Sequence, residues 1–251
     1  SCDVGQGDAT VVRSAGQIAL IDTGKYEDKI VSCLDKLAVS HISLLVLTHY
    51  DLDHVGAVSA AVRGRTVDMA LVTSFHDDRA GANWVRTALD LAHIQATPAE
   101  RGMAGQLGHA NWLVLNPDHD GGDAEDSNDG SIALLFNLES YNLLALADLG
   151  ERGQMRIAKH LGQWYNQQVA SIPLVMKVAH HGSADQYPEL IEAVHPAVAL
   201  VSVGKNNGYG HPTSRTLDVL GRAGSLIART DLLGSISIGV SVSMLAVAGG
   251  G

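Results

Sequence analysis

The chain has 251 residues, of which 46% are hydrophobic, and this is enough to bury a large core in one big domain or two small ones. Its 27 acidic and 17 basic residues give a formal net charge of −10, which argues against a module that binds nucleic acid by charge alone. The charge disfavours a nuclease without excluding it, because two divalent ions would cancel about four negative charges at the substrate site.

Membrane insertion and cysteine chemistry are not predicted by this sequence. The longest apolar stretch, 232–248, alternates polar and apolar residues, which predicts a half-buried strand rather than a membrane-spanning helix. Cys2 and Cys33 are the only cysteines, and they give neither a disulfide framework nor a thiolate zinc site. Any metal must therefore be held by histidine and aspartate. Ser1 stands where a start methionine would be and no signal peptide follows, so we expect a domain trimmed from something longer.

The first 40 residues predict two strands and a helix. Two glycines in 3–13 indicate a tight bend or a close backbone approach before or within a strand. A short strand at 18–21 ends at Asp22, and residues 29–37 predict a helix.

The next strand carries the strongest functional signal. Residues 44–47 are all apolar, which is typical of a strand buried on both faces. The turn that follows supplies four potential metal ligands, His49, Asp51, Asp53 and His54, before a helical pattern begins. Adjacent buried carboxylates repel one another unless a cation neutralises them, and mixed imidazole and carboxylate donors suit zinc, manganese or iron. The competing interpretation is a solvated acidic loop with incidental histidines.

Strands and helices alternate through the rest of the chain. We predict strands at 67–72, 111–115, 132–136, 143–146, 174–178 and 197–203, helices at 83–93, 151–165, 189–194 and 214–223, a surface loop at 116–130, and two final strands. Three strands again precede possible ligands: Asp148, the pair His180 and His181, and His211. This pattern predicts two sheets flanked by helices, with a site along one shared edge.

The segment His-Tyr-Asp-Leu-Asp-His at 49–54 resembles the metal motif of the metallo-β-lactamase superfamily, usually His-x-His-x-Asp-His, with Asp51 replacing the second histidine. This variant resembles the branch that contains the soluble domain of ComEC-type DNA-uptake (competence) proteins. Further segments resemble that branch in the same order: 3–9, 21–24, 128–131, Asp148, 180–183, 209–212 and 229–234.

The resemblance implies an α/β fold, the four-layer αββα sandwich, as a single domain over residues 1–245 with a tail at 246–251. It also implies one or two divalent ions, zinc or manganese, and hydrolysis by a metal-bound hydroxide. The activity that we expect is that of a phosphodiesterase or nuclease, because an anionic phosphodiester gains most from bound cations.

The resemblance also implies roles for individual residues. His49, Asp51 and a later histidine would hold one ion, while Asp53, His54 and a histidine of the 180–181 pair would hold the other, with Asp148 bridging. We assign His180 to the ligands, and Asp53, His181 and His211 to catalysis, although which late histidine is a ligand stays open. A histidine that does not ligate can protonate the leaving group.

Further residues are expected to support the ligands or contact the substrate: Asp8, Asp22, Asn128, Lys205 and Asn207. Asp8 and Asp22 are equally compatible with ordinary turns, and Lys205 with a solvated loop. The sequence departs from the family pattern at Ala147, usually glycine, and at Asn128, where many relatives carry a further histidine.

The expected partner is a phosphodiester, with single-stranded DNA as one candidate, and this segment is not expected to insert into a membrane. It would be a soluble domain in the bacterial cytoplasm or on the exterior of the cell envelope, as part of a longer membrane-associated chain. Two alternatives remain: hydrolysis of an ester, thioester or lactam, and a non-catalytic metal-binding domain of a membrane or competence assembly.

Overall fold

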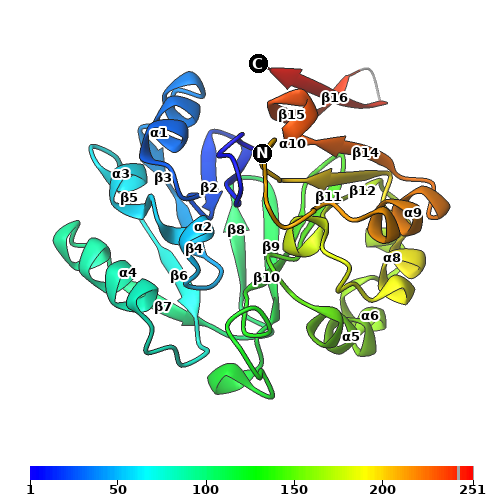
Figure 1. Ribbon diagram of the computed structural model, residues 1–251, viewed down its shortest axis with the longest axis horizontal. Helices are drawn as coiled ribbons and strands as arrows, with labels where there is room; N and C mark the ends of the chain where they lie inside the picture. The colour runs from blue at the N-terminus through cyan, green and yellow to red at the C-terminus, as the bar shows by residue number, and fades with distance from the viewer. Residues whose placement is uncertain (242–243, 251) are drawn as a thin grey trace.

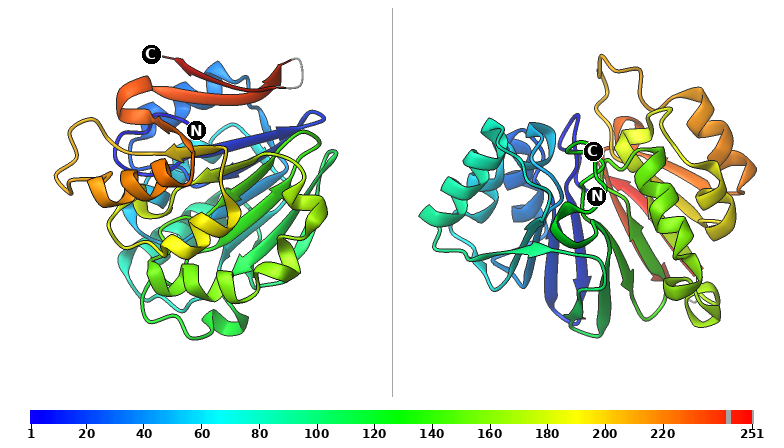
Figure 2. Two further views of the ribbon diagram at one scale, coloured as in Figure 1. Left: turned by 90° about the vertical axis from the view of Figure 1, so that its right-hand side faces the viewer. Right: turned by 90° about the horizontal axis from the view of Figure 1, so that it is seen from below.

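Two β-sheets pack face to face, and helices cover the outer side of each sheet (Figures 1 and 2). A computed structural model describes residues 1–241 and 244–250 of the protein. The four layers confirm the predicted αββα sandwich. Among the described residues, no helix is long and apolar enough to cross a bilayer.

The first sheet is built from the N-terminal 100 residues and has the strand order β1-β2-β4-β6-β7. Its central strands run parallel, so their carboxyl ends meet at one edge. The strands are β1 (Thr10–Ser14), β2 (Gln17–Ile21), β4 (Leu44–Leu47), β6 (Ala70–Thr73) and β7 (Ala96–Ala99), and the helices are α1 (Glu27–Lys36), α2 (Leu52–Val55), α3 (Val58–Val62) and α4 (Ala80–Leu91). A separate pair joins β3 (His41–Ile42) to β5 (Thr66–Val67).

The second sheet has seven strands in the order β14-β13-β12-β11-β10-β9-β8. The four strands from β11 to β14 run parallel. The strands are β8 (Ala104–Leu107), β9 (Ala110–Asn116), β10 (Ala133–Asn137), β11 (Asn142–Ala145), β12 (Leu174–Lys177), β13 (Val198–Val201) and β14 (Leu226–Arg229). The helices are α5 (Glu151–Lys159), α6 (Leu161–Trp164), α7 (Gln167–Ala170), α8 (Pro188–Val194), α9 (Ser214–Arg222) and α10 (Thr230–Leu233), with single 3-10 turns η1 (His119–Gly121) and η2 (Ala179–Gly182).

The apolar run of β4 is explained by its two buried faces. Leu45 and Leu47 pack under the helices of the first half, while Leu44 and Val46 point into the layer between the sheets. The same alternation holds in β12, where Val175 lies between the sheets. Sheets buried on both sides need such runs, because no face of the strand meets water.

Several predicted boundaries differ from the structure. The strand expected at 67–72 is wrong, because Asp68 and Met69 separate β5 from β6, which belong to different sheets. The helix expected at 151–165 breaks at His160, where the backbone leaves the helical conformation. Strands β7 and β8 had no clear pattern in the sequence.

The chain ends in a hairpin of β15 (Ser235–Ser241) and β16 (Met244–Gly250) that lies over one end of the sandwich (Figure 1). The domain boundary expected at 245 falls inside β16, which pairs with β15 as far as Gly250. Residues 242 and 243, within the stretch predicted as one half-buried strand, and residue 251 lie outside the described residues.

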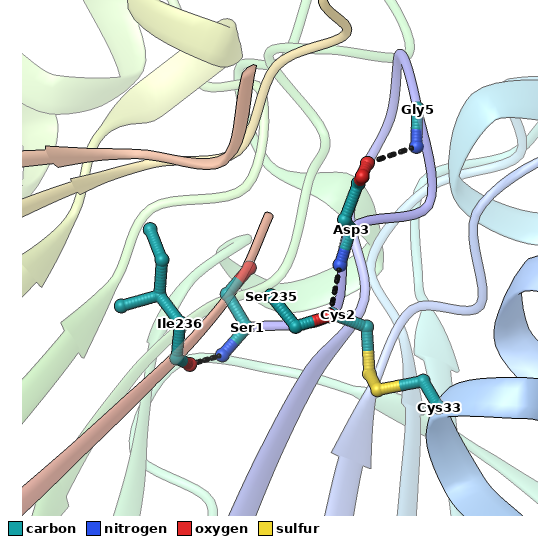
Figure 3. The surroundings of a disulfide bond; sticks show 7 residues. All are labelled: Ser1, Cys2, Asp3, Gly5, Cys33, Ser235 and Ile236. Carbon is teal, nitrogen blue, oxygen red and sulfur yellow. Dashed lines mark hydrogen bonds between the residues drawn. A yellow bond between two sulfur atoms is a disulfide. The ribbon is translucent and has the colours of Figure 1, made fainter. Parts of the chain in front are cut away.

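A disulfide joins Cys2 to Cys33 and fastens the N-terminal segment to α1 (Figure 3). This bond was not expected from two isolated cysteines, because their proximity depends on the path of the chain between them. The ends of the chain also meet here, since the Ser1 amino group donates to the carbonyl of Ile236 and the Asp3 amide donates to Ser235 Oγ (Figure 3).

We predict that the double substitution Cys2→Ser and Cys33→Ser lowers the free energy of unfolding by about 2–4 kcal/mol, because the bond closes a loop of moderate length in the unfolded chain. Denaturant unfolding of the wild type, with and without reductant, measures this difference. Reductant should not affect the double variant. Native protein in which both thiols react with an alkylating reagent without prior reduction would contradict the pairing.

Candidate metal centre

Both sheets deliver metal-ligating side chains to one shared edge. His49 follows β4 and His54 lies in α2, while Asp148 follows β11 and His181 lies in η2. Among the described residues, ligand atoms gather within 4.8 Å of one another in several overlapping groups: His49, His54 and Asp148; Asp53, His54 and His181; Asp8, Asp148 and His181; and Asp8, Asp22 and His54. The edge predicted from the sequence therefore brings these residues together.

Asp148 lies at the centre of this group. Its Oδ1 is 3.2 Å from His54 Nε2, and its Oδ2 is 3.4 Å from His181 Nε2. The carboxylate thus faces one imidazole from each half of the protein. A carboxylate in this position can contact two ions at once, which is compatible with the bridging role expected for it.

Asp22 contacts both Thr48 and His54 on the side of the imidazoles away from Asp148. It accepts hydrogen bonds from the Thr48 amide and hydroxyl, each at 2.8 Å, and lies 2.8 Å from His54 Nδ1. The Thr48 hydroxyl also lies 3.1 Å from His49 Nδ1. Because Nδ1 of each imidazole is engaged here, Nε2 of both His49 and His54 is directed to the centre. Asp22 therefore orients ligands and does not simply end a strand.

His181 is held in the same way by the second sheet. Its Nδ1 lies 2.9 Å from the carbonyl oxygen of Ser202, and its Nε2 lies 3.4 Å from Asp53 Oδ2. The backbone φ angles of His180 and His181 are both positive, at 48° and 52°, which is an uncommon conformation for residues with side chains. Such strain is typical of functional sites, where surrounding contacts hold it in place.

Asp8 and Lys177 form a buried ion pair beside His181. Lys177 is the last residue of β12, is only 2% exposed, and shares the inward face of the strand with Val175. Asp8 Oδ1 lies 3.3 Å from His181 Nδ1, so this acid connects the lysine to the histidine. Asp8 therefore lies behind the ligands, which is one of the two roles expected for it.

Gly7 lets the N-terminal segment approach the metal loop closely. Its φ is +130°, and a Cβ atom at this position would collide with the carbonyl oxygen of Asp53. That same oxygen accepts a hydrogen bond from the Asp8 amide at 3.1 Å. The predicted close approach at this glycine is thus an approach to the loop of Asp53 and His54.

The charges of these groups shift one another strongly. Burial alone would lower the pKa of His54, but the carboxylates of Asp148 and Asp22 raise it well above the usual histidine value. The pKa of His181 is likewise lowered by burial and raised, more strongly, by Asp148 and Asp8. For Asp148, burial raises the pKa, but His181 and His54 lower it well below its usual range. Without metal, protons on two buried imidazoles therefore balance the carboxylates.

His49 behaves differently from the other two imidazoles. Burial and the neighbouring charge of His54 lower its pKa to about 3, so it is neutral at physiological pH. A neutral imidazole with a free Nε2 is ready to bind a cation.

Unpartnered polar atoms also indicate a cation site. Within the described part of the chain, the buried atoms without a hydrogen-bond partner of good geometry include His49 Nε2, His54 Nε2, His181 Nε2, Asp148 Oδ1 and Asp8 Oδ1. Buried polar groups are rarely left unpaired, because each one costs free energy. Nitrogen and oxygen donors that converge in this way fit zinc or manganese.

The two adjacent histidines lie at different depths in the site. His181 is buried among the ligands, whereas the side chain of His180 is 30% exposed and its Nε2 lies 3.7 Å from Asp148 Oδ2. The geometry thus favours His181 as the late ligand. His180 lies on the solvent-facing side of the centre, which we call the open side. Residues one apart point in different directions, and the sequence alone did not distinguish them.

His211 reaches the open side from the loop after β13. Its ring centroid is 5.6 Å from that of His180. Burial and the charges of His180 and His181 lower the pKa of His211, so near neutral pH it is uncharged. This state does not favour the protonated acid expected from the sequence, but it leaves a hydrogen-bonding ring at the rim.

The remaining predicted residues lie around this centre, outside the groups of ligand atoms given above. Asn207 donates to the carbonyls of Gly204 and His211 and accepts from two backbone amides, so it shapes the His211 loop and is not free to bind a phosphate. Lys205 is exposed. Asn128 and Asp51 line a cavity of about 400 Å³ next to the metal loop. Asp51 also contacts Arg79, at 2.7 Å.

Three residues that support the site were not predicted. Lys177 had a signal, because this charged residue interrupts an otherwise apolar run three positions before the histidine pair. Thr48 precedes His49 but could equally have been a strand residue. Arg79 had no signal, since it lies on a different element from the Asp51 that it contacts.

Ala147 stands where the resemblance led us to expect glycine, and its backbone conformation is one that favours glycine. The φ angle of Ala147 is 48°, a left-handed conformation that costs a residue with a Cβ atom roughly 1–2 kcal/mol. Its carbonyl accepts a hydrogen bond from the His180 amide at 2.9 Å. The departure is therefore tolerated, and Asp148 still reaches the centre.

Curated relatives are bacterial competence proteins. ComE operon protein 3 of Bacillus subtilis is 26% identical over 255 residues, covering 93% of this chain and 32% of the relative. Competence protein ComA of Neisseria gonorrhoeae is 27% identical over 249 residues, covering 95% of this chain and 31% of the relative. These matches confirm the expected resemblance to ComEC-type proteins. The chain spans about a third of the length of these relatives.

Solved structures resemble the fold at low sequence identity. CmlA, a diiron beta-hydroxylase from Streptomyces venezuelae, matches with a TM-score of 0.58 and 15% identity, over 90% of this chain and 51% of that one. YhfI, a metallo-beta-lactamase fold protein from Bacillus subtilis, matches with a TM-score of 0.56 and 12% identity, over 89% and 88%. The model of the metallo-beta-lactamase superfamily matches residues 2–204. The chain therefore belongs to the metallo-beta-lactamase superfamily.

Proposed function

We propose that this domain is a metal-dependent phosphodiesterase or nuclease. One observation carries the proposal: unpartnered donor atoms of His49, His54, His181 and Asp148 converge from both halves of the fold. Such a donor set would hold one or two zinc or manganese ions. These ions would lower the pKa of water and stabilise charge that develops on a phosphoryl oxygen.

The residues divide between two ion positions. Asp53, His54 and His181 would hold one ion, and His49 with Asp51 would hold the other, with Asp148 shared between the two positions. Asp22, Thr48, Asp8 and the carbonyl of Ser202 keep the rings oriented through Nδ1. Imidazole rings whose orientation is fixed through Nδ1 need little rearrangement when an ion binds at Nε2.

The open side of the centre favours an anionic substrate. His180 and His211 lie there, and both side chains are partly exposed. Both rings can hydrogen-bond a phosphate oxygen or the oxygen of a leaving group. Single-stranded DNA is a candidate substrate because the relatives are competence proteins.

The disulfide indicates the type of cellular compartment in which this domain would act. Disulfides persist in oxidising compartments and are rare in the cytosol. The bond between Cys2 and Cys33 therefore favours the exterior of the cell envelope over the cytoplasm. We propose that the domain acts there as part of a longer membrane-associated chain, like the longer relatives that it matches.

We predict that Asp148→Ala lowers the cleavage of bis-p-nitrophenyl phosphate or single-stranded DNA by at least about a hundredfold, because two imidazoles and both ions lose their shared carboxylate. Steady-state rates with manganese or zinc measure the loss. Asp68→Ala is the control, because this acid directly follows β5 and its side chain is 60% exposed. This variant should cleave at the wild-type rate. Metal-loaded wild type that cleaves no phosphodiester but cleaves nitrocefin or a thioester would refute the proposed substrate class.

Metal affinity should fall as the pH falls. His54 and His181 hold protons because their pKa values are raised, and each must lose its proton before Nε2 can ligate. Each proton released makes binding about tenfold weaker for every pH unit below the raised pKa. Titration calorimetry in two buffers of different ionisation enthalpy measures the number of protons.

A matched control for proton release is His41, which forms an exposed pair with Asp68 at 2.7 Å and lies away from the centre. His41→Gln should release the same number of protons as the wild type. Ion binding that is equally tight at pH 6 and pH 8 would contradict the proton balance described for the metal-free site.

A further inference from the structure

Asp51 is shared between the metal centre and an arginine on another element. Its Oδ2 lies 3.8 Å from His49 Nε2, and its Oδ1 lies 2.7 Å from Arg79 Nη2. One oxygen therefore faces the imidazole while the guanidinium holds the other. Without this contact the carboxylate could turn about its last bond to face solvent, because its side chain is 34% exposed.

The guanidinium is itself held in place. Asp77 accepts from Arg79 Nε at 3.0 and 2.9 Å, from Nη2 at 2.7 Å, and from the Arg79 backbone amide at 2.8 Å. Two-pronged contacts of this kind fix the plane of a guanidinium. Asp77 is nearly buried, and the pairing lowers its pKa, since Arg79 hydrogen-bonds its charged form.

The backbone brings Arg79 to this position. Arg79 is the residue before α4, and Gly81 in the first turn of that helix packs on the metal loop. A Cβ atom at Gly81 would collide with the carbonyl oxygen of Tyr50, the residue between His49 and Asp51. The start of α4 is therefore pressed against the loop at the point where the arginine reaches Asp51.

The negative charge of Asp51 explains why it is paired with Arg79. The superfamily metal motif usually has a histidine at position 51, which is neutral when it ligates, whereas aspartate adds a negative charge beside His49. A partly exposed ion pair contributes little to stability, so stability alone does not explain so constrained an arrangement. Orientation of the ligand and local charge balance do explain it.

We propose that Arg79 is a positioning residue for Asp51, and that it allows aspartate to serve as a metal ligand where the superfamily motif usually has histidine. This inference rests on the ion binding of the proposed function and not on any hydrolytic activity. Its consequence is specific: Arg79 should matter while residue 51 is aspartate and should cease to matter when residue 51 is histidine.

The experiment is a double-mutant cycle with the ion alone as the probe. Wild type, Arg79→Gln, Asp51→His and the double variant are titrated with Mn²⁺ and Zn²⁺, and both the affinity and the number of bound ions are measured. We expect Arg79→Gln to weaken the binding of one ion about 10–100-fold in the wild type. In the Asp51→His background the same change should have less than about a threefold effect, because no carboxylate is left to orient.

Two further variants separate orientation from general damage. Arg79→Lys keeps the charge but loses the planar fork, so it should recover only part of the affinity. Arg101→Ala breaks a comparable surface pair, with Asp118, and should bind ions like the wild type. The side-chain amide of the Arg79→Gln variant can still donate to Asp77, so thermal unfolding should show a folded protein.

The outcomes distinguish this inference from the proposed function. Equal losses on Arg79→Gln in both backgrounds, or wild-type binding by Arg79→Gln, would overturn the positioning role. A wild type that binds two ions and depends on Arg79 but hydrolyses no phosphodiester would leave this role intact and overturn the function. A wild type that binds no ion would overturn both.

Discussion

The convergence of buried imidazoles on the carboxylate of Asp148 is the constraint on which the structure depends. His54 comes from the first half and His181 from the second, so the carboxylate joins the two sheets at one edge. Neither half contains a complete site. Since several buried carboxylates lie together here, their charge must be balanced, and this edge is stable when cations or protons are bound and costly when they are not.

The surrounding residues provide fixed charge and orientation where the ligands cannot. Lys177 pairs with Asp8 between the sheets, and Arg79 pairs with Asp51 at the open side. Asp22 accepts from Thr48 and faces His54, so one acid sets the direction of two imidazoles. A site that is organised before an ion arrives loses less entropy on binding, which is why so many contacts lie behind the ligands.

Local sequence predicted well where one physical requirement dominated. The apolar run of β4 could only be a strand buried on both faces, and the strand has the predicted bounds. Prediction failed where tertiary contacts decided: 67–72 is apolar enough for one strand, yet the chain changes sheet within it. The motif at 49–54 located the site because ligands at a strand end are local, whereas the choice between His180 and His181 depends on the turn η2.

The sequence by itself determined the class of fold, the edge at which the site lies and most of its ligands, because alternation of apolar residues and ligands at strand ends are properties of short segments. Only the tertiary structure decided which distant groups meet: Arg79 with Asp51, Lys177 with Asp8, and Cys2 with Cys33. These pairs join residues on different elements, and their distances depend on how the sheets and helices pack. No local pattern of residues encodes that packing.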